Sequence, residues 1–227
     1  MIFEFLGLPG AGKTTLCEDL RGWLAGIDTR LASTTVPTNR TRLSATIGIF
    51  LYWRAALVAA RALIASPRSW HSKRLAARWF LSTLSFYTPR RRNRPFLVLD
   101  EGLLQRSFLL FMEQDGFGSV DRVGRYIEAI PLPDVVVAVD LSPAESLARV
   151  RHRTRLLPRR FQSMAENDQL TAFNQGAELL DLVLARALDR ADSSTQVIRI
   201  PGNDLEQAKR RLAAEIAEKL QIRVPQS

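Results

Sequence analysis

The sequence contains a single cysteine and only two histidines in 227 residues. Cys17 alone cannot form an internal disulfide, and so few cysteines and histidines exclude a zinc cluster built from these residues. The first six residues lead directly into a glycine-rich segment, which leaves no room for the basic region, apolar core and cleavage site of a secretion signal. These absences favour a reducing compartment, and we expect a cytoplasmic protein.

Low-complexity linkers and internal repeats are also missing, because no run of proline, glycine and serine separates two parts of the chain. The hydrophobic content of 46% and the charged content of 24% are typical of a soluble globular protein. A chain of this length is sufficient for one α/β domain with a full core. We therefore expect a single domain that spans residues 1–227.

Acidic residues are absent from residues 29–99, although the whole chain contains 23 of them. The same segment holds 13 of the 32 basic residues, so the net charge of +9 comes entirely from this part of the chain. These basic residues are Arg30, Arg40, Arg42, Arg54, Arg61, Arg68, Lys73, Arg74, Arg78, Arg90, Arg91, Arg92 and Arg94. Such an uneven distribution indicates that the segment faces an anionic partner or substrate.

Apolar runs alternate with helix-like patterns along the chain. We expect strands at residues 2–6, 30–35, 95–100, 134–140 and 196–200, of which the third and fourth end in the carboxylates Asp100 and Asp140. Helices are expected at about 13–24, 43–65, 69–86 and 205–220, and another begins after the capping sequence Ser-Pro-Ala-Glu at 142–145. This alternation predicts an α/β fold with a doubly wound parallel sheet of about five strands and a helical insertion at about 43–94.

Residues 7–14 read Gly-Leu-Pro-Gly-Ala-Gly-Lys-Thr, which matches the pattern Gly-x4-Gly-Lys-Thr between an expected strand and an expected helix. Glycines let the backbone N–H groups turn toward phosphate oxygens, and the helix N-terminus adds partial positive charge. We therefore predict an ATP site with Mg²⁺, in which Lys13 contacts the β- and γ-phosphates and Thr14 binds the metal. The predicted nucleotide-binding residues are Gly10, Ala11, Gly12, Lys13, Thr14 and Thr15.

A magnesium ion beside nucleotide phosphates needs a carboxylate at the end of a neighbouring strand. Asp100 is the first candidate for this metal ligand, and the adjacent Glu101 either contacts the metal or orients an acceptor. The alternative for Asp100 is that it caps the following helix. Asp140 ends a similar run, but the capping sequence that follows it favours a structural role.

Arginines are dense after the helix that begins at residue 142, and they are Arg149, Arg151, Arg153, Arg155, Arg159 and Arg160. Guanidinium groups on a mobile loop stabilise a phosphoryl group during transfer, so we expect a lid at about 149–162. Arg151, Arg153 and Arg155 are its predicted catalytic residues, together with Lys13 and the carboxylate pair at 100–101. The alternative is a solvated basic helix end, because arginine near a helix C-terminus also complements the helix dipole.

These features together resemble the P-loop nucleoside and nucleotide kinases, and thymidylate kinase most of all. The likeness covers about two-thirds of the chain: residues 7–15, the strand that ends in Leu99-Asp100, the strand at 135–140, the arginine-rich segment and the final Pro-Gly-Asn loop at 201–203. The resemblance implies a five-stranded parallel sheet, ATP as phosphoryl donor and a closing lid. It also implies an adenine site near the lid and the last loop, which adds Gly202 to the predicted nucleotide-binding residues.

The acceptor is not given by this resemblance, because residues 43–94 do not match the acceptor-binding part of thymidylate kinase. Family members often carry Asp-Arg after the third strand, where this sequence has Asp100-Glu101, and Arg106 is a candidate replacement for that arginine. The basic segment without carboxylates favours an acceptor that is already anionic, such as a phosphorylated small molecule. The alternative is a hydroxyl acceptor with Glu101 or Asp100 as general base.

Residues 47–65 are apolar apart from Arg54 and Arg61, and Arg68 continues the spacing of seven. We do not expect a membrane span here, because each arginine near its centre would cost about 2.5 to 3.5 kcal/mol. Three interpretations remain open: a substrate-enclosing helix pair, a homodimer or partner contact through residues 45–65, and a weak membrane-surface association through an interfacial helix on anionic lipid. The run of arginines at 90–94 lacks a recognition motif, so we do not expect nucleic acid binding.

Two other classes of function are compatible with the phosphate-binding pattern. One is a regulatory NTPase that uses hydrolysis to change its conformation and phosphorylates no acceptor. The other is a membrane-surface scaffold that binds nucleotide without turnover. The dense arginines favour the kinase, because a lid closes over a group that is transferred.

Overall fold

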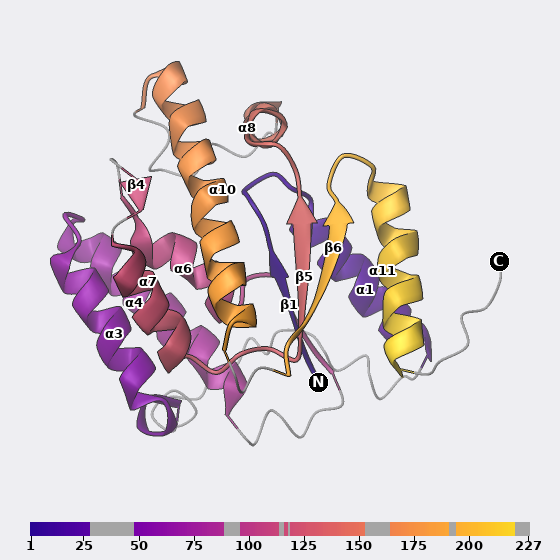
Figure 1. Ribbon diagram of the computed structural model, residues 1–227, viewed down its shortest axis with the longest axis horizontal. Helices are drawn as coiled ribbons and strands as arrows, with labels where there is room; N and C mark the ends of the chain where they lie inside the picture. Colours follow the sequence, from indigo (N-terminus) through magenta and orange to yellow (C-terminus); the bar gives the residue numbers. More distant parts are fainter. Residues whose placement is uncertain are drawn as a thin grey trace.

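The computed structural model describes residues 1–27, 48–88, 96–113, 116–117, 119–152, 164–190 and 194–220. Its centre is a parallel sheet in the order β2-β1-β5-β6, formed by Leu97–Leu99, Ile2–Leu6, Val135–Asp140 and Gln196–Pro201. The predicted α/β class with a parallel sheet is confirmed (Figure 1). Within the described residues the sheet has four strands where about five were predicted, and the strand predicted at 30–35 lies outside them.

The four strands coincide with four of the predicted apolar runs. In the register of the sheet, Phe3 lies between Val98 of β2 and Val135 of β5, and Val137 pairs with Ile198 of β6. Every residue of β1 and β2 is buried, which explains why these strands are apolar on both faces, with Glu4 of β1 as the one charged exception. Apolar runs therefore predicted where these four strands lie in the sequence.

Helices cover both faces of the sheet, as a doubly wound arrangement requires (Figure 1). Helices α1 (Lys13–Ile27) and α11 (Leu205–Leu220) pack on one face, against Phe3 and Phe5 of β1. The opposite face, with Ile2 and Leu6, is covered by α6 (Leu103–Phe111), α10 (Glu166–Leu188) and the helices behind them. The alternation of side chains along β1 thus divides the apolar core into two layers.

The predicted helical insertion contains two helices and a short 3-10 turn. They are α3 (Trp53–Ala65), α4 (Trp70–Leu84) and η2 (Ser85–Tyr87), and residues 48–51 are also helical. Ser69 is the N-cap of α4, because its hydroxyl accepts a hydrogen bond from the Ser72 N–H. The parts of the insertion at 43–47 and 89–94 lie outside the described residues.

Arg68 does not continue the helical face of Arg54 and Arg61, in contrast to the prediction. Helix α3 ends at Ala65, and the following Ser66 has an extended backbone. The Arg68 guanidinium turns inward and donates hydrogen bonds to the carbonyl oxygens of Leu109 and Met112 at the end of α6. Its charge therefore caps a helix C-terminus, and this role depends on contacts that are remote in sequence.

Other elements were not predicted. They are α6, α7 (Val120–Ala129), α10, and a short hairpin of β3 (Met112–Glu113) and β4 (Gly116–Phe117), whereas α8 (Pro143–His152) confirms the helix predicted to begin at the capping sequence. Helices α3, α4, α6 and α7 pack together beside the sheet in Figure 1. Among the described helices, none has both the length and the apolar character that crossing a membrane requires.

Candidate functional site

The glycine-rich loop connects β1 to α1 and has a backbone that favours glycine at two positions. Gly10 and Gly12 have φ angles of +93° and +97°, a region that other L-residues adopt at an energetic cost. A Cβ atom at Gly10 would also lie 2.7 Å from the carbonyl oxygen of Ser146 on α8. The Ser146 hydroxyl in turn donates to the carbonyl oxygen of Pro9. Loop and helix α8 therefore fit closely against each other.

Lys13 is folded back over this loop. Its ammonium group donates to the carbonyl oxygens of Gly7 and Leu8, at 2.8 and 2.9 Å. The cation thus lies inside the curve of the loop, beside the backbone that the sequence pattern assigns to phosphate. A ligand anion in the loop would compete with these two carbonyl oxygens for the ammonium group.

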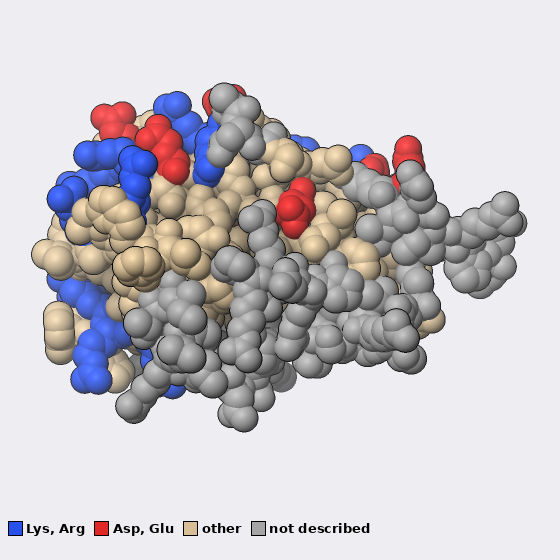
Figure 2. Space-filling view, turned by 90° about the horizontal axis from the view of Figure 1, so that it is seen from below, with Lys and Arg blue, Asp and Glu red and all other residues tan. Residues whose placement is uncertain are grey.

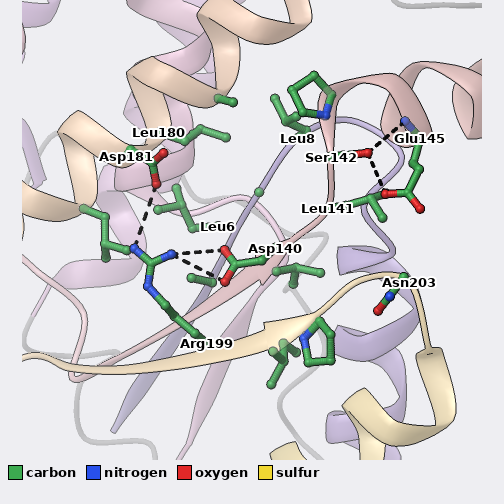
Figure 3. Close-up of a pocket in the computed structure, with 18 of the residues that line it drawn as sticks. Leu6, Leu8, Asp140, Leu141, Ser142, Glu145, Leu180, Asp181, Arg199 and Asn203 are labelled. Carbon is green, nitrogen blue, oxygen red and sulfur yellow. Dashed lines mark hydrogen bonds and ion pairs between the residues drawn. The ribbon is translucent and has the colours of Figure 1, made fainter.

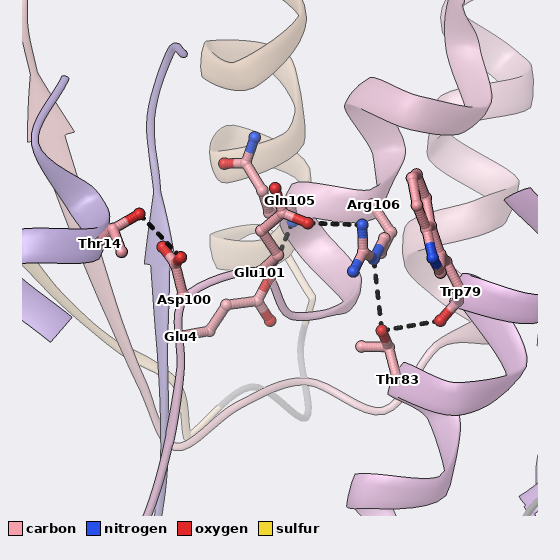
Figure 4. Close-up of polar contacts among 8 residues, drawn as sticks. All are labelled: Glu4, Thr14, Trp79, Thr83, Asp100, Glu101, Gln105 and Arg106. Carbon is pink, nitrogen blue, oxygen red and sulfur yellow. Dashed lines mark hydrogen bonds and ion pairs between the residues drawn. The ribbon is translucent and has the colours of Figure 1, made fainter. Parts of the chain in front are cut away.

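Thr14 and Asp100 are brought together although 86 positions separate them. The Thr14 hydroxyl donates to Oδ2 of Asp100 at 2.9 Å (Figure 4). The other carboxylate oxygen, Oδ1, is buried and has no hydrogen-bond partner among the described residues. A buried carboxylate oxygen without a partner is unfavourable, and binding a cation there would remove the penalty.

The two predicted strand-end carboxylates have different roles. Asp100 does not cap the next helix, because the N-cap of α6 is Gly102, which offers no side-chain hydrogen bond. Asp140 instead forms an ion pair with Arg199 of β6 at 3.3 Å. The capping sequence after Asp140 is confirmed, since the Ser142 hydroxyl accepts from the Glu145 N–H and donates to its carboxylate.

A cavity of about 390 Å³ adjoins the glycine loop. Its lining is formed by Gly10, Gly12, Thr15, Arg149, His152 and Leu205. Arg149 donates to the carbonyl oxygens of Gly202 and Asn203, so the end of α8 meets the loop that precedes α11. The predicted residue Thr15 therefore lines this cavity, and Gly202 lies next to it through its hydrogen bond with Arg149.

Arg151, for which a catalytic role was predicted, does not line the cavity beside the glycine loop. Its guanidinium forms an ion pair with Glu166 and hydrogen bonds to Oε1 of Gln169, both on α10. Successive residues of a helix point in different directions, so Arg149 and Arg151 of α8 cannot face the same neighbour. Arg153, Arg155 and most of the predicted lid lie outside the described residues.

A polar cluster extends from Asp100 toward α4. Glu101 forms an ion pair with Arg106 at 2.6 Å, and Nε of Arg106 donates to the Thr83 hydroxyl at 3.3 Å (Figure 4). The guanidinium also lies 5.6 Å from the centre of the Trp79 ring, where a cation is attracted to the aromatic face. Arg106 therefore occupies the side of Asp100 that faces the helical insertion.

Glu4 is a site residue that the sequence analysis did not identify. It lies in the middle of β1 and is completely buried. Oε1 accepts from the Gln105 N–H and Oε2 accepts from the Tyr87 hydroxyl, each at 2.8 Å. The Gln105 side chain in turn accepts from the N–H of Gly7. One buried carboxylate thus joins β1, the end of the helical insertion and the start of α6, close to the carboxylate pair at 100–101.

Burial raises the pKa of the Glu4 carboxyl from 4.5 to about 7, although its hydrogen bonds act in the opposite direction. Between these two values the unfolded chain releases a proton that the folded protein keeps, so the free energy of unfolding decreases as the pH rises. The decrease from this group should total about 3 kcal/mol. In Glu4→Gln this part of the pH dependence should be absent. Urea unfolding at several pH values between 5 and 8 measures it.

The exposed carboxylate Glu128 on α7 offers a matched control for that measurement. Glu128→Gln should keep the pH dependence of the wild type. Identical slopes of unfolding free energy against pH in the wild type and in Glu4→Gln would contradict the assignment.

A larger cavity of about 620 Å³ lies between α10 and the ends of β5 and β6 (Figure 3). Its lining includes the apolar Leu6, Leu8 and Leu180, and several of its polar groups are paired with one another. Arg199 bridges Asp140 at 3.3 Å and Asp181 at 3.9 Å. None of the residues at positions 10–15 or 100 lines this cavity. The smaller cavity beside the glycine loop is therefore the better candidate for a nucleotide.

A scan of the chain against protein-family models gives no match, and a search of curated proteins gives none either. The features of the chain that point most directly to a function are the two glycines with positive φ, the position of Lys13 and the contact between Thr14 and Asp100.

Proposed function

We propose that the protein is an ATP-dependent phosphotransferase that acts on an anionic, for example phosphorylated, small molecule. The observation that carries the proposal is the contact between Thr14 and Asp100 next to a glycine loop that holds Lys13. This combination supplies backbone donors for phosphates, a cation for the terminal phosphate and a carboxylate at the end of the adjacent strand. A simple strand-to-helix turn requires neither the cation nor the carboxylate.

The residues fit a magnesium ion bound together with a nucleotide. Magnesium usually takes one or two protein oxygens and completes its shell with water and phosphate oxygens, so Thr14 and Asp100 suffice as a protein donor set. The buried Oδ1 of Asp100 without a hydrogen-bond partner supports this assignment. When bound, the metal would neutralise charge on the phosphates during transfer.

The reaction moves the γ-phosphoryl group of ATP to the acceptor. The bond between the γ-phosphorus and the bridging oxygen breaks, a bond from an acceptor oxygen to phosphorus forms, and ADP leaves. Lys13 exchanges its bonds to Gly7 and Leu8 for the phosphate oxygens and stabilises their charge. The cavity lined by Arg149, His152 and Leu205 is the proposed place for the adenosine end of the nucleotide.

Arg106 is the proposed recognition group for the acceptor anion. It lies beside Asp100 and Glu101, and its side chain is mostly buried, which strengthens an ionic contact relative to one in water. The ion pair with Glu101 holds the guanidinium in place before the acceptor arrives. An acceptor phosphate would compete with Glu101 for Arg106 and would need no general base, because it is already ionised.

Incubation of the full-length protein with ATP, magnesium and a pool of anionic metabolites tests the proposal. We expect a product with the mass of one added phosphoryl group, formed together with ADP. Release of ADP at the same rate with and without the pool would instead indicate an NTPase. Nucleotide binding with no turnover in any pool would contradict the proposed transfer.

Glu101→Gln separates the proposed acceptor class from a hydroxyl acceptor. With an anionic acceptor, kcat should stay within about threefold of the wild type, because no base is needed. Arg106→Ala should instead raise the KM for the acceptor by roughly tenfold to a hundredfold, since one charge-assisted contact is lost. Steady-state kinetics with varied acceptor measures both effects.

A hydroxyl acceptor predicts the opposite pattern for these two variants. A fall in kcat of about a hundredfold or more in Glu101→Gln, with an unchanged acceptor KM in Arg106→Ala, would assign Glu101 as general base. The exposed Glu128→Gln substitution on α7 is the matched control and should leave both constants unchanged.

A further inference from the structure

Helix α3 and the helical residues just before it carry a row of large apolar side chains that point away from the protein. Phe50, Trp53 and Ile64 are 83%, 60% and 76% exposed, and Leu57 lies between them on the same side. The opposite side of α3 packs into the core through Ala55, Ala59 and Leu63. The helix therefore has two apolar sides, and only one of them contacts the rest of the chain.

Hydrogen bonds at both ends of α3 hold this row of side chains in place, so their exposure does not result from a poorly anchored helix. The Tyr52 hydroxyl donates to the carbonyl oxygen of Tyr87 at the beginning of α3. At its end, Lys73 donates to the carbonyl oxygen of Ile64, so this contact joins the end of α3 to the first turn of α4, which carries the exposed Trp70. These contacts support one continuous surface, which we call the basic apolar face. It comprises Phe50, Trp53, Arg54, Leu57, Arg61, Ile64, Trp70, Arg74 and Arg78.

The charges on this face have one sign. Arg54 and Arg61 are exposed on α3 two helical turns apart, and Arg74 and Arg78 are exposed on α4. No aspartate or glutamate occurs anywhere in residues 29–99. Figure 2 shows lysine and arginine side chains on two sides of an area of other residues, at the end of the molecule that α3, α4 and α7 form, with acidic side chains among the basic ones on one of these sides.

We propose that the basic apolar face docks the protein on the surface of an anionic lipid bilayer. Arginines pair with lipid phosphates, while tryptophan, phenylalanine and isoleucine insert at the level of the head groups. A two-fold dimer through this face is disfavoured, because it would place the same arginines against one another without an acidic partner. The lipid surface supplies the negative charge that the chain lacks here.

The helix geometry indicates that α3 lies flat on the lipid. It has 13 residues, and no described helix is suited to crossing a bilayer. A short helix with apolar residues along one side and arginines beside them is typical of interfacial binding. The proposal is independent of the phosphotransferase function, because none of the residues that form the glycine loop or bind Asp100 belongs to this face.

Co-sedimentation of the full-length protein with vesicles tests the proposal. The probes are vesicles of phosphatidylcholine alone and of phosphatidylcholine with roughly one-third phosphatidylglycerol. We expect at least a tenfold stronger partition to the anionic vesicles and a decrease at high salt, because the attraction is screened. Arg54→Glu with Arg61→Glu should reduce the partition at least tenfold, and Trp53→Ser with Ile64→Ser should reduce it by a similar factor.

Arg210→Glu with Arg211→Glu is the control with the same change in net charge. These arginines are exposed on α11, across the sheet from α3 (Figure 1), and the variant should bind vesicles within about threefold of the wild type. Equal losses in both charge variants would overturn the proposal, and so would equal binding to neutral and anionic vesicles. A dimer that the Trp53→Ser and Ile64→Ser variant dissociates, without vesicle binding by the wild type, would also overturn it. Circular dichroism checks that each variant is folded.

Discussion

Lys13→Ala should weaken ATP binding by about a hundredfold and reduce turnover by at least the same factor. The ammonium group of Lys13 already lies inside the glycine loop, where it donates to two carbonyl oxygens. Among the described residues, Lys13 supplies the one side-chain cation inside the curve of the loop. Without it, only the backbone donors of the loop remain there. Titration of a fluorescent ATP analogue measures the affinity, and ADP formation measures the turnover.

The control for this variant is Lys209→Ala on α11. Lys209 forms surface ion pairs with Asp19 and Glu206, so its loss should leave ATP affinity and turnover within about threefold of the wild type. Two hydrogen bonds are lost in Lys13→Ala, and we expect a decrease in stability of about 1 to 2 kcal/mol, which keeps the variant folded. Full affinity and turnover in a folded Lys13→Ala protein would exclude the proposed phosphate site.

Asp100→Asn should lower kcat by about a hundredfold or more while nucleotide binding without magnesium stays close to that of the wild type. The substitution keeps the size of the side chain and an oxygen that can accept from the Thr14 hydroxyl. It removes the negative charge that the metal requires and replaces one carboxylate oxygen with a hydrogen-bond donor. Turnover measured against magnesium concentration should therefore shift to higher concentrations.

Asp140→Asn provides a comparison at the end of the neighbouring strand. The Asp140 carboxylate pairs with Arg199 at the larger cavity and has no contact with Thr14. The same chemical change at this position should leave kcat and its magnesium dependence within about threefold of the wild type. Equal losses of activity in both variants would mean that negative charge at either strand end supports turnover. Asp100 would then not be a specific metal ligand.

Local sequence patterns predicted those parts of the site whose structure depends on residues close by in the sequence. The glycine loop, the strand before it and the capping sequence at Ser142 are determined within a few positions, because turn geometry and helix capping are local. Asp100 was also found from sequence, since a carboxylate that follows an apolar strand must lie at the carboxyl edge of a parallel sheet. Its hydrogen bond to Thr14 agrees with that position.

Contacts between remote segments explain what the sequence analysis missed. Arg149 and Arg151 look equivalent in sequence, and only the packing of α8 between the last loop and α10 gives them different partners. Arg68 has the spacing of a helical face, but the end of α3 turns it toward α6. Glu4 did carry a signal, because one carboxylate inside an apolar strand must be paired or protonated when buried.

The sequence of α10 also has the periodic apolar pattern of a helix, although no helix was predicted there. Phe173, Leu180 and Leu184 recur with the spacing of one helical face, and acidic residues occupy the first turn. Its partners on α6, α7 and α8 could not be found from this pattern. Periodicity indicates which side of a helix is buried, whereas the identity of the buried neighbours depends on the tertiary fold.

Gly102 limits how the proposed acceptor specificity can be redesigned. A Cβ atom at this position would overlap the carboxyl group of Glu4, which leaves no room for a side chain between β2 and α6. In a library that varies residues 100–106 together, most variants would therefore not fold. Positions 79, 83 and 106 surround the same polar cluster from helices, and substitution there changes the lining of the cluster without moving the backbone that carries Asp100.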